Sequence, residues 1–216
     1  MFGYEALVRS ADPDLSTPGK LLDAADRLGR VQELGVRVRD AVAAAVGSVP
    51  PGALVCVNLH ALDLTSEHLY GLQSPLSLHA ERVVLEVTER TALHRVDHLQ
   101  HRMRQLRDIG YRIAVDDLGA SHAGLSSFRQ IGPDLVKLDM SLIRDINASE
   151  AKTKLVRNMI NLCSQDLGMR VVCEGVETEP ERDTLLGIGA DLLQGYLLGM
   201  PSRTFQPTTA LASRAS

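Results

Sequence analysis

Short runs of Val, Leu, Ile and Ala recur along the chain, and their interiors show no strict alternation of apolar and polar residues. Runs of this kind are typical of strands that are buried on both faces of a parallel sheet. We therefore predict seven strands, at residues 2–8, 53–58, 82–88, 112–117, 134–139, 170–175 and 190–195.

The segments between these runs have helical periodicity and recognisable helix starts. Thr17 followed by Pro18 predicts an N-cap with proline in the first turn, and Thr178 with Glu181 has the spacing of a capping box. Another helix is predicted to start after Ser149, with an apolar stripe that we assign to Leu155, Met159 and Leu162. Strands that alternate with helices predict a parallel α/β fold.

Nearly every predicted strand ends in a polar residue. In chain order these residues are Glu5, Asn58, Glu86, Asp116, Asp117, Lys137, Glu174 and Gln194. A single acid at a strand end is more often a helix cap or a loop ion pair than a ligand, but caps need no placement inside continuous apolar runs. In a (β/α)8 barrel the carboxyl ends of the strands converge on one mouth, where active sites are built. We therefore predict a TIM-type barrel with these residues around its mouth.

Five of these residues are carboxylates, and such a ring would repel itself unless cations lay among its members. Carboxylate and amide oxygens are ligands that suit magnesium or manganese. The neighbouring pair Asp116 and Asp117 is suited to bridging two ions, an arrangement that supports in-line phosphoryl displacement. Asp139, close to Lys137, either supports the lysine or caps the next helix, and the sequence does not decide between the two.

The composition excludes several classes of function. The net charge is −4 without a basic stripe, and only 3% of residues are aromatic, so we expect no duplex nucleic acid as a partner. No apolar run reaches the length of a membrane span. The three cysteines lack metal-site or disulfide spacing and are expected to be reduced packing residues of a cytoplasmic protein.

Seven ordered motifs carry a family resemblance. They are YEALVR with Glu5-Ala6-Leu7, VNLHALDL (57–64), LEVTER (85–90), VDDLGASHAGLSSF (115–128), DLVKLDMSLI (134–143), VVCEGVET (171–178) and LLQGYLLGMP (192–201). Together they resemble the EAL domain family, phosphodiesterases of the bacterial second messenger cyclic di-GMP. The likeness implies an EAL-type domain over residues 1–205, and we expect residues 206–216 to form a frayed tail. The family pattern has a further strand before residues 2–8, which this chain begins too late to contain.

The resemblance implies a role for each matching position. One cation would be bound by Glu5, Asn58, Glu86 and Asp116, and a second by Asp116, Asp117 and Glu174, with Asp117 and Glu174 counted as catalytic together with Lys137. Arg9 would contact a substrate phosphate. Gln194 and Glu177 would also belong to the substrate-binding site, with Gln194 ordering water or substrate, and Glu89 would anchor the loop after Asp117. The implied reaction is cleavage of one ester bond to give linear pGpG. The family is compatible with a homodimer and with an upstream regulatory domain or partner.

Two alternatives stay open. The loop after Asp117 departs from the commoner family form at Leu118, Ser121 and His122, so a catalytically impaired domain that senses cyclic di-GMP or binds a protein partner is the second hypothesis. A third is a barrel enzyme that uses Lys137 to form a Schiff base. Five surrounding acids would keep that lysine protonated, which opposes the third hypothesis.

Overall fold

The computed structural model describes residues 1–88, 96–119, 128 and 130–205. The predicted tail 206–216 and residues Glu89, Ser121 and His122 lie outside this range, so the expectations for them stay predictions. No helix within these ranges is long and apolar enough to cross a membrane.

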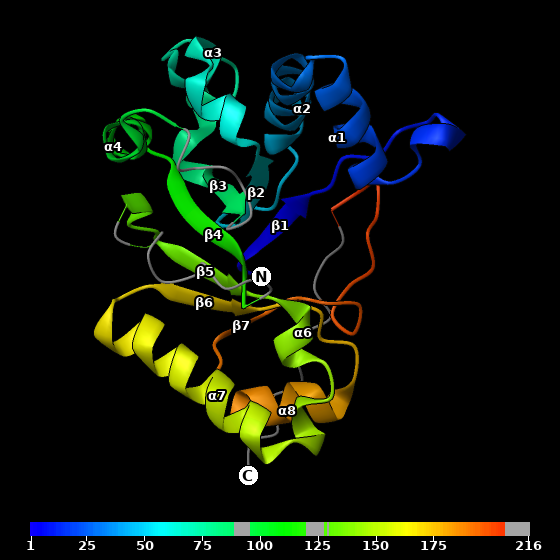
Figure 1. Ribbon diagram of the computed structural model, residues 1–216, viewed down its shortest axis with the longest axis vertical. Helices are drawn as coiled ribbons and strands as arrows, with labels where there is room; N and C mark the ends of the chain where they lie inside the picture. The colour runs from blue at the N-terminus through cyan, green and yellow to red at the C-terminus, as the bar shows by residue number, and fades with distance from the viewer. Residues whose placement is uncertain (89–95, 120–127, 129, 206–216) are drawn as a thin grey trace.

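The described chain forms one parallel sheet of seven strands that are paired in sequence order. The strands are β1 (Gly3–Ala6), β2 (Leu54–Leu59), β3 (Val83–Thr88), β4 (Arg112–Leu118), β5 (Leu135–Leu138), β6 (Arg170–Cys173) and β7 (Leu192–Leu193). Figure 1 shows the sheet curled into a half-barrel with helices around its outside. The predicted number, order and parallel direction of the strands are confirmed. No backbone pairing joins β7 to β1 within the described residues.

The helices connect successive strands. They are α1 (Pro18–Arg27), α2 (Val31–Val46), α3 (Glu67–Tyr70), α4 (Leu99–Ile109), α6 (Met140–Ile143), α7 (Glu150–Asn161) and α8 (Glu179–Gly187). Shorter helical turns are η1 (Pro13–Leu15), η2 (Ala61–Thr65), η3 (Ser77–Arg82), η5 (Ile146–Ala148) and η6 (Leu162–Asp166). The predicted starts are confirmed, because Thr17 caps α1, Ser149 caps α7, and Thr178 and Glu181 form a capping box on α8.

The predicted apolar stripe of α7 is wrong at Leu155 and Leu162, which are exposed, although Met159 packs against the core. Leu155 is 49% exposed, whereas the buried residues of this helix and the turn after it are Val156, Ile160 and Cys163. The two stripes have the same spacing and are both apolar, so periodicity alone does not choose between them. The side chains that turn toward the sheet are the more compact ones.

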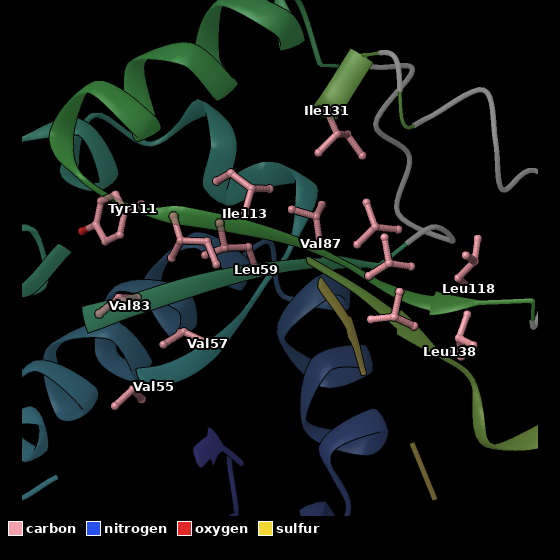
Figure 2. Close-up of a cluster of buried hydrophobic side chains, with 14 of the residues drawn as sticks. Val55, Val57, Leu59, Val83, Val87, Tyr111, Ile113, Leu118, Ile131 and Leu138 are labelled. Atoms are coloured by element: carbon pink, nitrogen blue, oxygen red, sulfur yellow. The ribbon is translucent and has the colours of Figure 1, made fainter. Parts of the chain in front are cut away.

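The central strands β3 to β6 are buried on both faces, whereas the edge strands β1 and β7 are half-buried. The outer faces pack against the helices in the main core, where Val83, Leu85 and Val87 of β3 are inaccessible to solvent. Figure 2 shows this layer, with side chains from β2, β3, β4 and β5 directed to the same side of the sheet. The inner faces form a smaller cluster inside the curl, made of Val84, Ala114, Leu135 and Val172 with Phe2, Leu54, Cys56 and Leu192. Burial on both faces explains why the strands read as continuous apolar runs.

Candidate active site at the carboxyl ends of the strands

The polar residues of the site follow from the alternation of each strand. On β3, Val84 lies in the inner cluster, and Glu86, two residues later, faces the same side at the carboxyl end of the strand. The same two-residue step connects Cys56 with Asn58, Ala114 with Asp116, Leu135 with Lys137, Val172 with Glu174 and Leu192 with Gln194. The inner cluster therefore forms the floor of the site, and the polar residues lie above it.

Lys137 lies at the centre of four carboxylates. Its Nζ atom is 2.7 Å from Oε1 of Glu174 and 3.1 Å from Oε1 of Glu86. The same atom is 3.4 Å from Oδ1 of Asp116 and 3.5 Å from Oε2 of Glu5. The Lys137 side chain is 3% exposed and that of Glu86 is fully buried, so these charges interact with little screening by water.

Two amide side chains hold Glu5 in place. Asn58 Nδ2 donates a hydrogen bond to Glu5 Oε1 at 3.0 Å, and Gln194 Nε2 donates to Glu5 Oε2 at 2.6 Å. These bonds come from β2 on one side and from the residue after β7 on the other. Glu5 is therefore oriented from both flanks of the site.

Asp116 and Asp117 are consecutive, and ordinary alternation would send their side chains to opposite faces of β4. The pairing of β4 with β5 instead shifts register between Val115 and Leu118, as at a β-bulge, and Asp117 has a positive φ of 59°. The carboxylates of Asp116, Asp117 and Glu174 consequently offer ligand oxygens that all lie within 4.8 Å of one another. The irregular backbone thus brings both aspartates to the same site.

Burial shifts the protonation of the cluster. It raises the pKa of Glu86 to about 7 and that of Glu174 to about 8, although the Lys137 ammonium lowers both. Burial lowers the pKa of Lys137, but the carboxylates of Glu86, Glu174, Glu5 and Asp116 outweigh it and raise this pKa well above its usual range. Lys137 is therefore a permanent ammonium ion at physiological pH.

The acidic cluster has the properties of a cation site. Both carboxylate oxygens of Glu86 are buried, and neither has a hydrogen-bond partner of ordinary geometry among the described residues, despite the nearby ammonium. A buried carboxylate without such bonds is costly unless a charge offsets it. The donor atoms are carboxylate oxygens with one amide, the set that hard divalent cations prefer. The residues present therefore fit one or two divalent cations.

Three residues predicted for the site are not placed in the cluster by its contacts. Arg9 is exposed, and its guanidinium donates to Val8 O at 2.8 Å. Glu177 forms a bidentate ion pair with Arg144, with both contacts at 2.5 Å. The sequence interpretation missed Arg144, since 33 residues separate it from its partner. Glu89, the predicted loop anchor, lies outside the described residues.

Asp139 caps α6 by accepting from Ser141 N at 2.9 Å, which decides the question that the sequence left open.

Comparisons with known proteins identify the family of this chain. The model of the EAL domain family matches residues 1–201. The bifunctional diguanylate cyclase/cyclic di-GMP phosphodiesterase MucR of Pseudomonas aeruginosa is 30% identical over 222 residues, which cover 98% of this chain and 32% of MucR. An uncharacterized protein of Sinorhizobium fredii is 32% identical over 98% of this chain. The chain thus spans 26% and 32% of the length of these two curated relatives.

Solved structures are similar in fold as well. A MucR phosphodiesterase structure in complex with cyclic di-GMP has a TM-score of 0.81 and 29% identity, covering 93% of this chain and 89% of that one. A manganese and cyclic di-GMP complex of Klebsiella pneumoniae BlrP1 has a TM-score of 0.80 and 32% identity, covering 91% of this chain and 51% of that one. With its sheet, its strand-end carboxylates and a family match over nearly its whole length, this chain belongs to the EAL domain family.

Proposed function

We propose that this domain is a metal-dependent phosphodiesterase that hydrolyses one ester bond of cyclic di-GMP and releases linear pGpG, in bacterial second-messenger signalling. The observation that carries the proposal is the charge of the site. Four carboxylates surround the Lys137 ammonium, and a fifth, Asp117, lies with Asp116 and Glu174 so that their ligand oxygens converge within 4.8 Å. Two divalent cations would make this set neutral. The relatives' complexes with cyclic di-GMP, one of them with manganese, support the choice of substrate and cation.

The two cations, magnesium or manganese, divide the ligands between them in this proposal. One would be held by Glu5, Asn58, Glu86 and Asp116, and the other by Asp116, Asp117 and Glu174. When bound, the cations supply Lewis acidity toward the phosphodiester and toward the attacking water. Asp116 would be shared, which fits its contacts, because its carboxylate lies 3.4 Å from Lys137 Nζ and within 4.8 Å of ligand oxygens of Asp117 and Glu174.

The chain's own residues supply the remaining chemistry. A carboxylate oxygen of Asp117 or Glu174 accepts the proton of the attacking water, and the bond between phosphorus and the 3′-oxygen breaks as the new bond forms. The Lys137 ammonium, which cannot lose its proton at neutral pH, stabilises the negative charge that develops on the phosphoryl oxygens. The leaving 3′-oxygen takes up a proton from solvent, so the reaction consumes one water.

Three further residues complete the proposal. Arg9 lies on the segment after β1 and binds a substrate phosphate, which requires its exposed guanidinium to leave Val8 O. Gln194 orients Glu5 and orders water or substrate beside it. Glu177 is assigned in this proposal to substrate binding beside the site, and Arg144 pairs with its carboxylate. We also propose that the domain works with an upstream regulatory domain or partner, or as a homodimer, and in the cytoplasm.

The second candidate function is binding of cyclic di-GMP without hydrolysis. It is favoured by the departures at Leu118, Ser121 and His122, of which only Leu118 lies within the described residues. The Schiff-base hypothesis is disfavoured, because that chemistry needs a lysine of lowered pKa and the pKa of Lys137 is raised.

Chromatography of cyclic di-GMP incubated with the protein and Mn²⁺ tests the proposal. We expect pGpG to form, and we expect both EDTA and the variant Asp116→Asn to abolish it. A dinucleotide that binds but is recovered intact would instead support the sensor function. Product formation that survives EDTA would contradict the role of the cations.

A further inference from the structure

Glu181 is a buried carboxylate outside the acidic cluster. It lies in the first turn of α8 and is 1% exposed. Its Oε1 atom accepts a hydrogen bond from Asp145 N at 3.0 Å, and its Oε2 atom accepts from Glu177 N and Thr178 N, each at 3.0 Å. Burial alone raises the pKa of Glu181, but these backbone N–H groups outweigh it and hold the pKa below its usual range. The side chain is therefore a permanently charged acceptor at neutral pH.

Only one of these three bonds belongs to the helix cap. A capping box requires the bond from Thr178 N, the backbone of the N-cap residue, together with the reciprocal bond from Glu181 N to Thr178 Oγ1. The bonds from Asp145 and Glu177 come from outside the helix. Asp145 also has a positive φ of 55°, an uncommon conformation for a residue other than glycine, though one that aspartate adopts more readily than most. Two of the three bonds therefore do something other than start α8.

These two bonds join the segments that leave β5 and β6. Residues 139–145 follow β5, and residues 174–178 follow β6. The segments touch at their starts as well, because Glu174 N donates to Leu138 O at 3.1 Å. A Cβ on Gly175, whose φ is 71°, would lie 2.4 Å from Met140 Cβ. Contacts at both ends thus make the two segments one unit.

Each segment continues directly from a residue of the acidic site. Lys137 is the last residue but one of β5, and Glu174 is the first residue after β6. Their side chains make the shortest ion pair of the cluster, 2.7 Å between Nζ and Oε1. The backbone pairing of β5 with β6 ends at Leu138 and Cys173, so beyond it Glu174 is held by its bond to Leu138 O and by the contacts between the two segments.

We infer that Glu181 is a positioning residue, which ties the segment after β5 to the segment after β6 and so fixes the Glu174 carboxylate relative to Lys137 for cation binding. This inference rests on the proposed function, because it assigns Glu174 to a cation. Replacing a residue that orients metal ligands without touching the metal commonly changes the metal affinity by about 10- to 100-fold. Glu181 would be such a group although it touches neither cation nor substrate.

The test is calorimetric titration of Mn²⁺ into the metal-free protein, with the variants Glu181→Gln and Thr178→Ala. Glutamine has one acceptor oxygen, so it cannot serve Asp145 and the Glu177–Thr178 pair together. We expect Glu181→Gln to weaken the affinity of one Mn²⁺ site by about tenfold or more. Thr178→Ala removes a bond of the same cap, 3.4 Å long, but leaves the three bonds to Glu181 in place, so we expect its Mn²⁺ affinity to stay within about twofold.

An equal loss of Mn²⁺ affinity in both variants would mean that Glu181 acts only as part of the helix cap. An unchanged Mn²⁺ affinity in Glu181→Gln would mean that Glu181 does not position the site. Either result overturns the inference. If Glu181→Gln does not fold, Glu181→Asp replaces it, since this shorter carboxylate keeps its charge for the cap but does not reach Asp145. We expect the same loss of affinity from it. A wild-type protein that binds no Mn²⁺ overturns the proposed function and this inference with it. Binding by the wild type with unchanged binding by the variants overturns this inference alone.

Discussion

Gln194 donates a hydrogen bond of 2.6 Å to Glu5, and this bond connects the residue after β7 with β1, at the two edges of the curled sheet. The two residues are 189 positions apart. Within the described residues no backbone pairing closes the sheet here, so the side-chain bond links its edges at the level of the acidic site.

Replacing Gln194 is therefore expected to weaken the cation site more than the fold. In Gln194→Leu, Oε2 of Glu5 loses a donor and keeps only the ammonium at 3.5 Å. We expect the Mn²⁺ concentration for half-maximal activity to rise by about tenfold, with the urea midpoint changed little. A loss of stability without a change in Mn²⁺ dependence would contradict this role.

Lys137 is expected to stabilise the metal-free protein. Lys137→Met removes the ammonium from among four carboxylates, and leaving a buried charge without its partner typically costs about 3–5 kcal/mol. Urea unfolding at pH 8 in EDTA should detect a loss of this order. Mn²⁺ should then restore more stability to the variant than it adds to the wild type. A variant as stable as the wild type in EDTA would show that the carboxylates do not need the lysine.

The raised pKa values of Glu86 and Glu174 predict how stability depends on pH. Because the folded metal-free chain holds protons that the unfolded chain has released, its free energy of unfolding should fall as the pH rises from about 4.5, the ordinary glutamate value, to about 8. A shift in the pKa of Glu86 from 4.5 to about 7 corresponds to about 3 kcal/mol at most. The lowered pKa of Glu181 acts in the opposite direction, but only below about pH 4.5.

The control for this pH effect is Glu86→Gln. The variant keeps the histidines and the carboxylates whose pKa is lowered. Subtracting its pH profile of the free energy of unfolding from that of the wild type therefore leaves the contribution of Glu86. We expect a shallower decline between pH 5 and 8 in urea unfolding with EDTA present. Parallel profiles would mean that Glu86 is not protonated in the folded metal-free protein.

The positive φ of Asp117 can be tested without reference to catalysis. Asp117→Gly and Asp117→Ala both remove the carboxylate, so their difference in stability reports on the backbone. Alanine is disfavoured in the left-handed region and glycine is not, and we expect the glycine variant to be more stable by about 1 kcal/mol. At an ordinary strand position the preference would be reversed. Thermal unfolding in EDTA measures the difference.

The sequence was sufficient to predict the sheet and the convergence of most of the polar cluster, because continuous apolar runs indicate buried parallel strands and the carboxyl ends of such strands meet at one edge. A parallel strand buried on both faces directs every second side chain inward, so a polar residue two positions after an inner apolar one must face the same centre. Val84 and Glu86 illustrate this on β3. The sequence identified Glu174 and Lys137 from their places at the ends of two predicted strands, and these strands are neighbours in the sheet.

Features that depend on irregular backbone or distant contacts could not be predicted in this way. The bulge that turns Asp117 toward Asp116 has no signature in the spacing of residues. The pairing of Arg144 with Glu177 depends on how two loops approach each other. Glu181 was identifiable as part of a capping box, but its bond to Asp145 was not. On α7, two apolar stripes one residue apart gave the wrong buried face.

The stoichiometry of Mn²⁺ binding tests most directly whether the acidic site holds two cations. Calorimetric titration of the metal-free wild type should give two Mn²⁺ per chain, and Asp117→Asn, which keeps a side chain that tolerates a positive φ, should give one. One Mn²⁺ per chain in both proteins, or no saturable binding in the wild type, would contradict the account.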